Sequence, residues 1–297
     1  MKSTSWPLVA LLHALLAAYP VGAVPVEVVD ARSRPVRLAQ PAQRIVALAP
    51  HLTELVYAAA AGSHLAGVAR FSDYPPDARR LPVVSDALNI DLERMLALRA
   101  DLVLAWEGGT PADAVARIER AGLPVFVAAA GTLDDIARNL EAIARLAGTT
   151  EAASAQREAF TAGLAALRQR RQVATRPRVF YEIWDRPLMT VSDRHHIGEI
   201  IALCGGVNVF GDARALAPEV TREALIAARP ELVLGGTSAD RAPDFAARWR
   251  ALPPPMNRWP VQFVPADLIQ RPTPRVLNAI RQVCAGIDAA RGDGKRQ

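Results

Sequence analysis

The sequence predicts two doubly wound α/β lobes that are joined by a long connecting helix and hold a ligand cleft between them. Three observations lead to this fold class. Short apolar segments alternate with helical patterns in each half of the chain, a long helical segment separates the halves, and one motif recurs at a constant interval. Alternating strands and helices are typical of parallel sheets that carry helices on both faces.

The first lobe is expected over residues 24–131 and the second over residues 177–292. After a polar lead-in, the first has strands near 44–48, 65–68, 102–105 and 125–128 and helices near 52–61, 92–98 and 112–121. The second repeats the alternation, with strands near 179–183, 232–235 and 261–264 and helices near 197–204, 222–228 and 274–288. The strands are short and apolar, as buried strands of a parallel sheet are.

Residues 132–176 are expected to connect the two lobes. Thr132 and Asp135 make a capped helix start, and apolar residues then recur at helical spacing as far as Gly148. The segment 151–172 contains no proline and one glycine, which favours a long helix over a flexible linker. A stiff connection predicts small lobe motions rather than wide hinge closure.

An internal repeat indicates that the lobes are equivalent. Asp91 and Thr221 each open a helix as a capping residue, and each is followed two positions later by a glutamate, Glu93 or Glu223. The stretches that follow, 98–104 and 228–234, align at the same interval. The helix dipole favours a first-turn glutamate by about 0.3–1 kcal/mol. Because both lobes present one at the same place, the pair could also contact a roughly two-fold partner that carries arginines.

The first 23 residues have the pattern of a secretory signal peptide. Lys2 precedes an apolar run over residues 8–18, and Val21-Gly22-Ala23 places small residues before a cleavage point. A buried N-terminal helix is the alternative. The run is shorter than the roughly 20 residues of a membrane-spanning helix, and no later run reaches that length. We therefore expect an exported chain without a membrane span.

The two cysteines, Cys204 and Cys284, agree with export. An oxidising compartment favours a disulfide between them, and two buried free thiols are the alternative. Neither lies in a CxxC motif or near a histidine partner, so zinc binding and thiol catalysis are not expected.

Charge and motifs argue against several classes of function. The formal net charge is +5, but no basic cluster is interleaved with aromatics, so nucleic-acid binding is not expected. The signatures GxSxG, GxxxxGK, GxGxxG and HExxH are absent. His51 follows a strand end and could line the cleft, whereas the adjacent His195 and His196 would diverge in a regular helix or strand. No metal site, cofactor or enzymatic activity is therefore predicted.

Aromatic residues are sparse, so their positions are informative. Phe71, Tyr74, Trp106 and Trp184 all follow predicted strands. Each could pack on its own lobe, but four such positions across both lobes favour a large, flat, partly apolar ligand. Asp267 and Arg271 follow the strand near 261–264, where they could hydrogen-bond a ligand or pair with each other.

Several segments resemble a known family. They are Arg44 to Pro50 with Thr53-Glu54-Leu55, Phe71-Ser72-Asp73-Tyr74-Pro75-Pro76, the stretch from Asp91 to Trp106 with its Trp-x-Gly-Gly element, the stretch from Leu203 to Phe210, and Asp267 to Arg271. Together they resemble the iron/B12 periplasmic-binding family, in particular the vitamin B12-binding proteins of ABC importers. The resemblance implies one binding domain over residues 44–292.

The resemblance also implies roles for individual residues. Phe71 would stack on cobalamin or a related corrinoid, Trp106 would form a second aromatic wall, and Asp267 and Arg271 would contact the ligand. Glu93 and Glu223 would dock into arginine pockets on two permease subunits, and Cys204–Cys284 would be the family disulfide.

The implied protein is a periplasmic monomer whose ligand is cargo rather than cofactor. Three positions depart from the family pattern: Phe71 replaces a tyrosine, Leu268 replaces a frequent tryptophan, and Ala87-Leu88 lack an aromatic. Haem or an iron–siderophore is the alternative ligand, and His51 could coordinate the haem. A chelatase-like enzyme is the alternative class.

Overall fold

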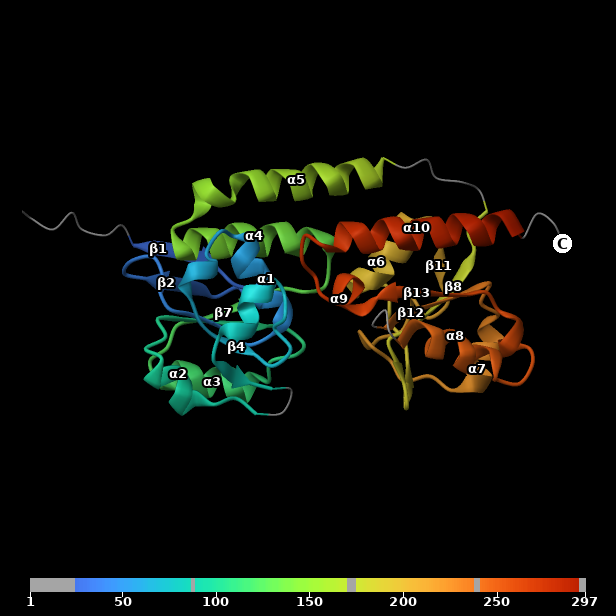
Figure 1. Ribbon diagram of the computed structural model, residues 1–297, viewed down its shortest axis with the longest axis horizontal. Coiled ribbons are helices and arrows are strands. Elements are labelled where there is room, and N and C mark those ends of the chain that lie inside the picture. Colours follow the sequence, from blue (N-terminus) through green and yellow to red (C-terminus); the bar gives the residue numbers. More distant parts are fainter. Residues whose placement is uncertain (1–24, 87–88, 170–174, 238–240, 294–297) are drawn as a thin grey trace, which may run out of the picture.

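A computed structural model describes residues 25–86, 89–169, 175–237 and 241–293. The predicted signal peptide lies outside these ranges. Figure 1 shows two α/β lobes side by side. The long helices α4 (Leu133–Ala147), α5 (Thr150–Arg168) and α10 (Val276–Asp293) run along one edge of the molecule. This is the predicted fold class. In the described ranges, no helix is both long and apolar enough to cross a membrane.

The N-terminal lobe is built on a five-stranded parallel sheet. Its strands lie in the order β5 (Val83–Ser85), β4 (Leu65–Ala69), β3 (Ile45–Ala47), β6 (Leu102–Trp106) and β7 (Val125–Ala128). The helices that follow these strands are α1 (Pro50–Ala58), α2 (Leu92–Ala97), α3 (Ala112–Arg120) and α4 (Leu133–Ala147).

Alternate residues of each strand face opposite sides of this sheet. Leu102 and Leu104 pack with residues of α1 and α4, whereas Val103 packs with residues of α2 and α3. Both faces are therefore covered by helices, which explains why β3, β6 and β7 are apolar at every position.

The C-terminal lobe repeats this plan with a four-stranded parallel sheet. Its strands lie in the order β11 (Val207–Asn208), β8 (Arg178–Glu182), β12 (Leu232–Thr237) and β13 (Val261–Pro265). The helices are α6 (His196–Leu203), α7 (Arg222–Ala228), α8 (Ala242–Arg250), α9 (Ala266–Ile269) and α10 (Val276–Asp293). Val179 and Tyr181 share a core with α6 and α10, and Phe180 between them packs against α8.

Smaller elements complete the described chain. Two antiparallel hairpins are formed by β1 (Val26–Val29) with β2 (Pro35–Leu38), and by β9 (Trp184–Asp185) with β10 (Leu188–Met189). Single 3₁₀ turns occur at Gly62–His64, Pro76–Arg80 and Met256–Arg258. The first hairpin lies where the sequence predicted only a polar lead-in.

The connecting segment contains two helices, where the sequence predicted a helix as far as Gly148 and a long helix over residues 151–172. Thr132 caps α4 in a capping box with Asp135, as predicted, and Gly148 ends the helix with φ 70°. The next helix, α5 (Thr150–Arg168), runs beside α4 and continues alongside α10 (Figure 1). One continuous hydrophobic core includes residues of both lobes and of all three helices.

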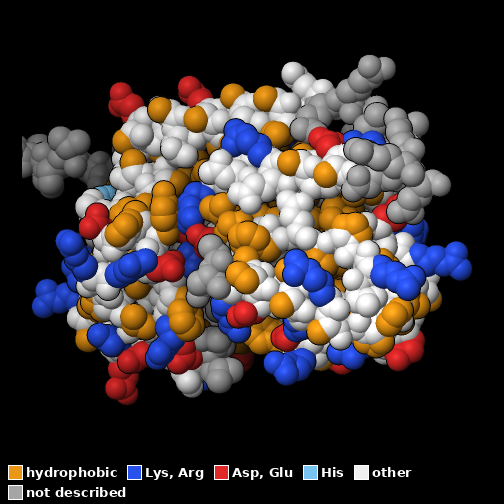
Figure 2. Space-filling model, turned by 45° about the vertical axis from the view of Figure 1, so that its right-hand side comes forward, with side chains coloured by type: hydrophobic (Ala, Val, Ile, Leu, Met, Phe, Trp, Pro, Cys, Tyr) orange, Lys and Arg blue, Asp and Glu red, His pale blue; other side chains and the backbone are white. Residues whose placement is uncertain are grey.

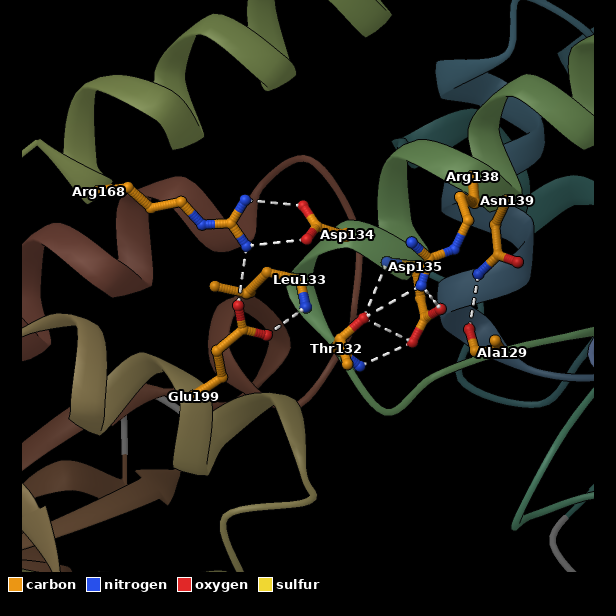
Figure 3. A network of polar contacts seen from close by, with 9 residues as sticks. All are labelled: Ala129, Thr132, Leu133, Asp134, Asp135, Arg138, Asn139, Arg168 and Glu199. Atoms are coloured by element: carbon orange, nitrogen blue, oxygen red, sulfur yellow. Dashed lines mark hydrogen bonds and ion pairs between the residues drawn. The ribbon is translucent and has the colours of Figure 1, made fainter.

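A polar joint fixes the point where the connecting helices meet the second lobe (Figure 3). Glu199 on α6 accepts a hydrogen bond from the Leu133 backbone N–H at 2.7 Å, at the start of α4. Arg168, the last residue of α5, pairs with both Glu199 (2.9 Å) and Asp134 (2.8 Å). The ends of three helices from different parts of the chain are thereby held together.

Cys204 and Cys284 form a disulfide, as expected. Their Cα atoms are 4.7 Å apart, and the bridge links the end of α6 to the middle of α10. The disulfide thus ties the edge of the second lobe to one of the long helices.

Candidate functional site

A hollow of about 410 Å³ lies at the carboxyl ends of β3, β4 and β6 in the N-terminal lobe. Ligands of parallel α/β sheets bind at this end of the strands. The lining side chains come from the start of α1, the loops after β4, β5 and β6, and the first two turns of α3. They include His51, Arg70, Phe71, Asp86, Ile90, Trp106, Thr110, Asp113 and Arg117. Three predicted ligand-binding residues, His51, Phe71 and Trp106, therefore lie together.

Trp106 is positioned by the glycines that follow it. Gly108 adopts φ 85°, a conformation that favours glycine. A Cβ atom added to Gly109 would lie 1.8 Å from Cζ2 of the Trp106 ring, so a side chain at this position would displace the indole. The Trp106 ring also meets the His51 ring edge to face, with centroids 5.1 Å apart. The two glycines of the Trp-x-Gly-Gly element are therefore needed for the Trp106 ring to pack in this position.

Phe71 has both an unusual backbone and an exposed ring. Its φ is 66°, in the left-handed region that non-glycine residues seldom occupy. The residue is 75% exposed, although it is a large apolar side chain at the edge of the hollow. A strained backbone and an exposed aromatic ring are both unfavourable in the isolated protein. Their occurrence together makes Phe71 a candidate ligand-contacting residue.

His51 lines the hollow, and two further histidines, His195 and His196, lie at the start of α6 in the second lobe. Burial lowers the pKa of His51 to about 3, and charge on His196 and Arg271 adds to this effect. Burial also lowers the pKa of His195 to about 3 and lowers that of His196. All three imidazoles are therefore neutral at pH 7.

The expectation that His195 and His196 diverge is wrong. Their ring centroids are 4.4 Å apart with a 30° tilt. His195 is the N-cap of α6, outside the regular helix, and its Nδ1 accepts a hydrogen bond from the Ile197 backbone N–H. The change of backbone conformation between the two residues brings their rings together.

Arg271 and Asp267 lie on the second lobe, and they pair with other residues rather than with each other. Arg271 reaches across to the first lobe, where Nη1 lies 2.9 Å from Glu54 Oε1 and 2.7 Å from Asp73 Oδ1. Asp267 pairs with Arg275 at 2.6 Å. Neither Arg271 nor Asp267 is among the described residues that line the hollow. The sequence interpretation did not assign a role to Glu54, Asp73 or Arg275.

Two further aromatics differ in their surroundings. Trp184 lies in the hairpin strand β9, just after β8, and is 61% exposed, with its indole N–H bonded to the Arg186 carbonyl. It is not among the described residues of the hollow. Tyr74 instead packs under the Arg275 guanidinium, whose central carbon is 3.8 Å from the ring centroid. Tyr74 therefore belongs to the contact between the lobes.

Glu93 and Glu223 occupy matching positions in the two lobes. Asp91 caps α2 by accepting from the Arg94 N–H, and Thr221 caps α7 by accepting from the Ala224 N–H. Both glutamates are exposed in the first helical turn. Hydrogen bonds from its own backbone N–H and from Thr221 lower the pKa of Glu223. In Figure 1, α2 and α7 lie in different lobes on the edge opposite α5.

The repeat extends beyond these helices. The residues just after them, Arg99 and Arg229, both have positive φ, at 52° and 45°. Arg44, just before β3, donates to the Leu98 carbonyl at 2.6 Å, and Arg178, at the start of β8, donates to the Ala228 carbonyl at 2.7 Å. The two lobes therefore share their local hydrogen bonding as well as their topology.

A larger groove of about 830 Å³ lies elsewhere, between β1, α4 and α5. Its charged side chains are engaged locally: Arg157 pairs with Glu141, and Arg145 donates to the Glu27 carbonyl. No strand of the main sheets ends in this groove. The smaller hollow is therefore the better candidate site.

Figure 2 shows one face of the molecule, on which Lys and Arg side chains are scattered among acidic ones and hydrophobic side chains gather toward the middle. Among the described residues, no group of three or more His, Cys, Asp or Glu side chains is arranged to hold a metal ion.

Two equivalent α/β lobes, with a hollow at the strand ends of the first lobe, define the class of two-lobed ligand-binding receptors. A sequence profile described as periplasmic binding protein matches residues 45–282, and the chain belongs to that family. Two curated relatives are vitamin B12-binding proteins. That of Vibrio parahaemolyticus is 35% identical over 85% of this chain and 92% of its own length. That of Vibrio campbellii is 36% identical over 84% of this chain and 91% of its own length.

Solved structures share the fold. The periplasmic vitamin B12-binding protein of Vibrio cholerae aligns with TM-score 0.77 and 34% identity, over 84% of this chain and 98% of its own. A periplasmic haem-binding protein from Roseiflexus sp. RS-1 aligns with TM-score 0.71 and 22% identity, over 84% of this chain and 99% of its own. At this identity, the similarity to the haem-binding protein shows only that the two proteins share a fold.

Proposed function

We propose that this chain captures cobalamin or a related corrinoid in the periplasm and delivers it to an inner-membrane ABC transporter. The strained, exposed Phe71 beside Trp106 is the observation that carries the proposal. Aromatic rings at the edge of a cavity suit a flat ligand that needs apolar contact. The similarity to vitamin B12-binding relatives supports a corrinoid as that ligand.

In this function the chain binds and releases cargo and catalyses no reaction. Phe71 and Trp106 supply apolar walls, and His51 supports the Trp106 ring by packing against it edge to face. Trp184, Asp267 and Arg271 approach from the second lobe, where they contact the amide-bearing rim of the ligand. Cobalamin is transported and is not a resident cofactor.

Isothermal titration of the mature protein with cyanocobalamin tests the ligand class. We expect one-to-one binding, whereas haem and a ferric siderophore, titrated in parallel, release no comparable heat. Binding of haem alone would make haem the ligand and leave the transport role unchanged. Haem is the second candidate ligand because haem-binding proteins share this fold. No binding of any of the three would favour an enzymatic role.

Glu93 and Glu223 are the residues with which the protein contacts the transporter. Their equivalent, exposed positions suit a two-fold permease that offers one arginine pocket to each lobe. The double variant Glu93→Arg with Glu223→Arg is expected to abolish corrinoid uptake by cells while ligand affinity stays unchanged.

A matched control carries the same change in charge on another edge of the molecule. Glu151 and Glu158 are exposed on α5, and replacing both by arginine should leave uptake intact. Loss of uptake in both double variants would point to a general effect of charge. Loss of affinity in the first variant would instead assign Glu93 and Glu223 to the fold or the cleft.

A further inference from the structure

The two lobes meet beside the hollow through a cluster of charged residues. Glu54, on α1 of the first lobe, is only 4% exposed. Its Oε1 lies 2.9 Å from Arg271 Nη1 and 3.1 Å from Arg275 Nη1, and its Oε2 accepts a hydrogen bond from the Thr273 hydroxyl at 3.0 Å. Every one of these donors comes from the second lobe. A buried carboxylate is tolerated because these donors satisfy it.

The same cluster holds the loop that carries Phe71. Arg271 donates to the Phe71 carbonyl at 3.2 Å and pairs with Asp73 at 2.7 Å. Non-glycine residues in the left-handed region persist only where their surroundings fix them. The Arg271 guanidinium supplies two such contacts within three residues of the strained position.

Arg275 binds the same cluster without lining the hollow. One of its nitrogens pairs with Glu54, another pairs with Asp267 at 2.6 Å, and its guanidinium covers the Tyr74 ring at 3.8 Å. Arg275 therefore contacts residues of both lobes: Glu54 and Tyr74 in the first lobe, and Asp267 in the second. Arg275 is not among the described residues that line the 410 Å³ hollow.

We propose that Arg275 is a positioning residue for ligand capture. By holding Glu54, Tyr74 and Asp267 together, it fixes the spacing of the lobes and the loop 71–74 before a ligand arrives. Phe71 is thereby presented to the hollow in its strained conformation. The consequence for affinity rests on the proposed function, whereas the consequence for lobe spacing does not.

Spin-label distances in the ligand-free protein test the spacing. Both native cysteines are in the disulfide, so labels can be attached through Ala97→Cys on α2 and Ala224→Cys on α7, two exposed positions in different lobes. Adding Arg275→Gln is expected to broaden the distance distribution. Arg281→Gln is the matched control, because Arg281 is exposed on α10 and bonds only its neighbour Asn278 among the hydrogen bonds described.

An unchanged distribution in Arg275→Gln would overturn the proposal. If that variant does not fold, Tyr74→Leu replaces it, because this change removes the ring under the guanidinium without leaving a buried charge unpaired. The same broadening, smaller in extent, is then expected, and a distribution like that of the unsubstituted protein would again overturn the proposal.

Affinity for cyanocobalamin provides the readout that a purely structural role would not change. Arg275→Gln is expected to weaken binding about ten-fold in the otherwise unchanged protein and less than about two-fold in a Phe71→Ala background. Equal losses in both backgrounds would show that Arg275 does not act through Phe71. If the unsubstituted protein binds no cyanocobalamin, the proposed function fails, while the distance measurement still decides the role of Arg275 in the joint.

Discussion

At the scale of single residues, the clearest conflict between stability and function lies at Phe71. An L-residue in the left-handed conformation costs about 1–2 kcal/mol, and the exposed ring gains little from burial in the free protein. Phe71→Gly removes the strain, whereas Phe71→Ala keeps it, and both remove the ring. We expect the glycine variant to be more stable than the alanine variant by about 1 kcal/mol, after the entropic cost of glycine.

Denaturant midpoints of the two variants measure this difference, and titration with cyanocobalamin measures affinity. Both variants should bind more weakly than the unsubstituted protein by a similar factor. A glycine variant less stable than its alanine counterpart would mean that the positive φ at this position is not a source of strain.

Sequence reasoning at this scale identified residues but not their contacts. Phe71, Trp106 and His51 were predicted at strand ends, and they lie together because parallel strands end on one edge of the sheet. The interactions of Arg271 with Glu54 and Asp73 join residues about 200 positions apart. No local pattern encodes such a pairing. The ligand contacts of Trp184, Asp267 and Arg271 stay predictions.

At the scale of elements, the sequence predicts most strands of the two parallel sheets well and the hairpin strands poorly. Strands β3, β6, β7, β8 and β12 are covered on both faces, so each contains a short apolar run that stands out from its surroundings. By contrast, β1 and β2 alternate between exposed and buried positions and carry the exposed Glu27–Arg37 pair. That hairpin therefore resembles a polar lead-in.

Short elements are missed for a related reason. Strands β9, β10 and β11 have two residues each, too few to show any periodicity. Helix α8 contains Pro243 and is rich in arginine, and it is anchored chiefly by the buried Phe245 and Trp249. Two anchors a turn apart fix a helix in the folded protein but give a weak pattern in the sequence.

At the scale of the whole molecule, the lobes are held together at two separate places. The joint of Arg168, Asp134 and Glu199 lies at the ends of the connecting helices, and the joint around Glu54 lies beside the hollow. A hinge needs a few residues that are free to rotate. Two joints and a shared core oppose that rotation, which agrees with the small lobe motion predicted from the connecting segment.

The neutral histidines make the stability of this assembly sensitive to acid. His51 and His195 have a folded pKa of about 3 against 6.5 in the unfolded chain, so the unfolded state binds more protons between these values. The free energy of unfolding is therefore expected to fall as the pH falls from about 6.5 toward 3. The loss is at most about 1.4 kcal/mol per pH unit for each histidine. Urea midpoints measured from pH 7.5 down to pH 4.5 record this slope.

His195→Asn separates this effect from that of the acidic groups. Asparagine is among the best N-cap residues, so it can replace the contact that His195 makes with the Ile197 N–H, and it does not titrate. The variant should match the unsubstituted protein at pH 7.5 and lose less stability on acidification. Carboxylates such as Asp134, whose pKa is lowered by Arg168, contribute equally in both proteins. Parallel slopes below pH 6.5 would therefore show that His195 is not held neutral in the fold.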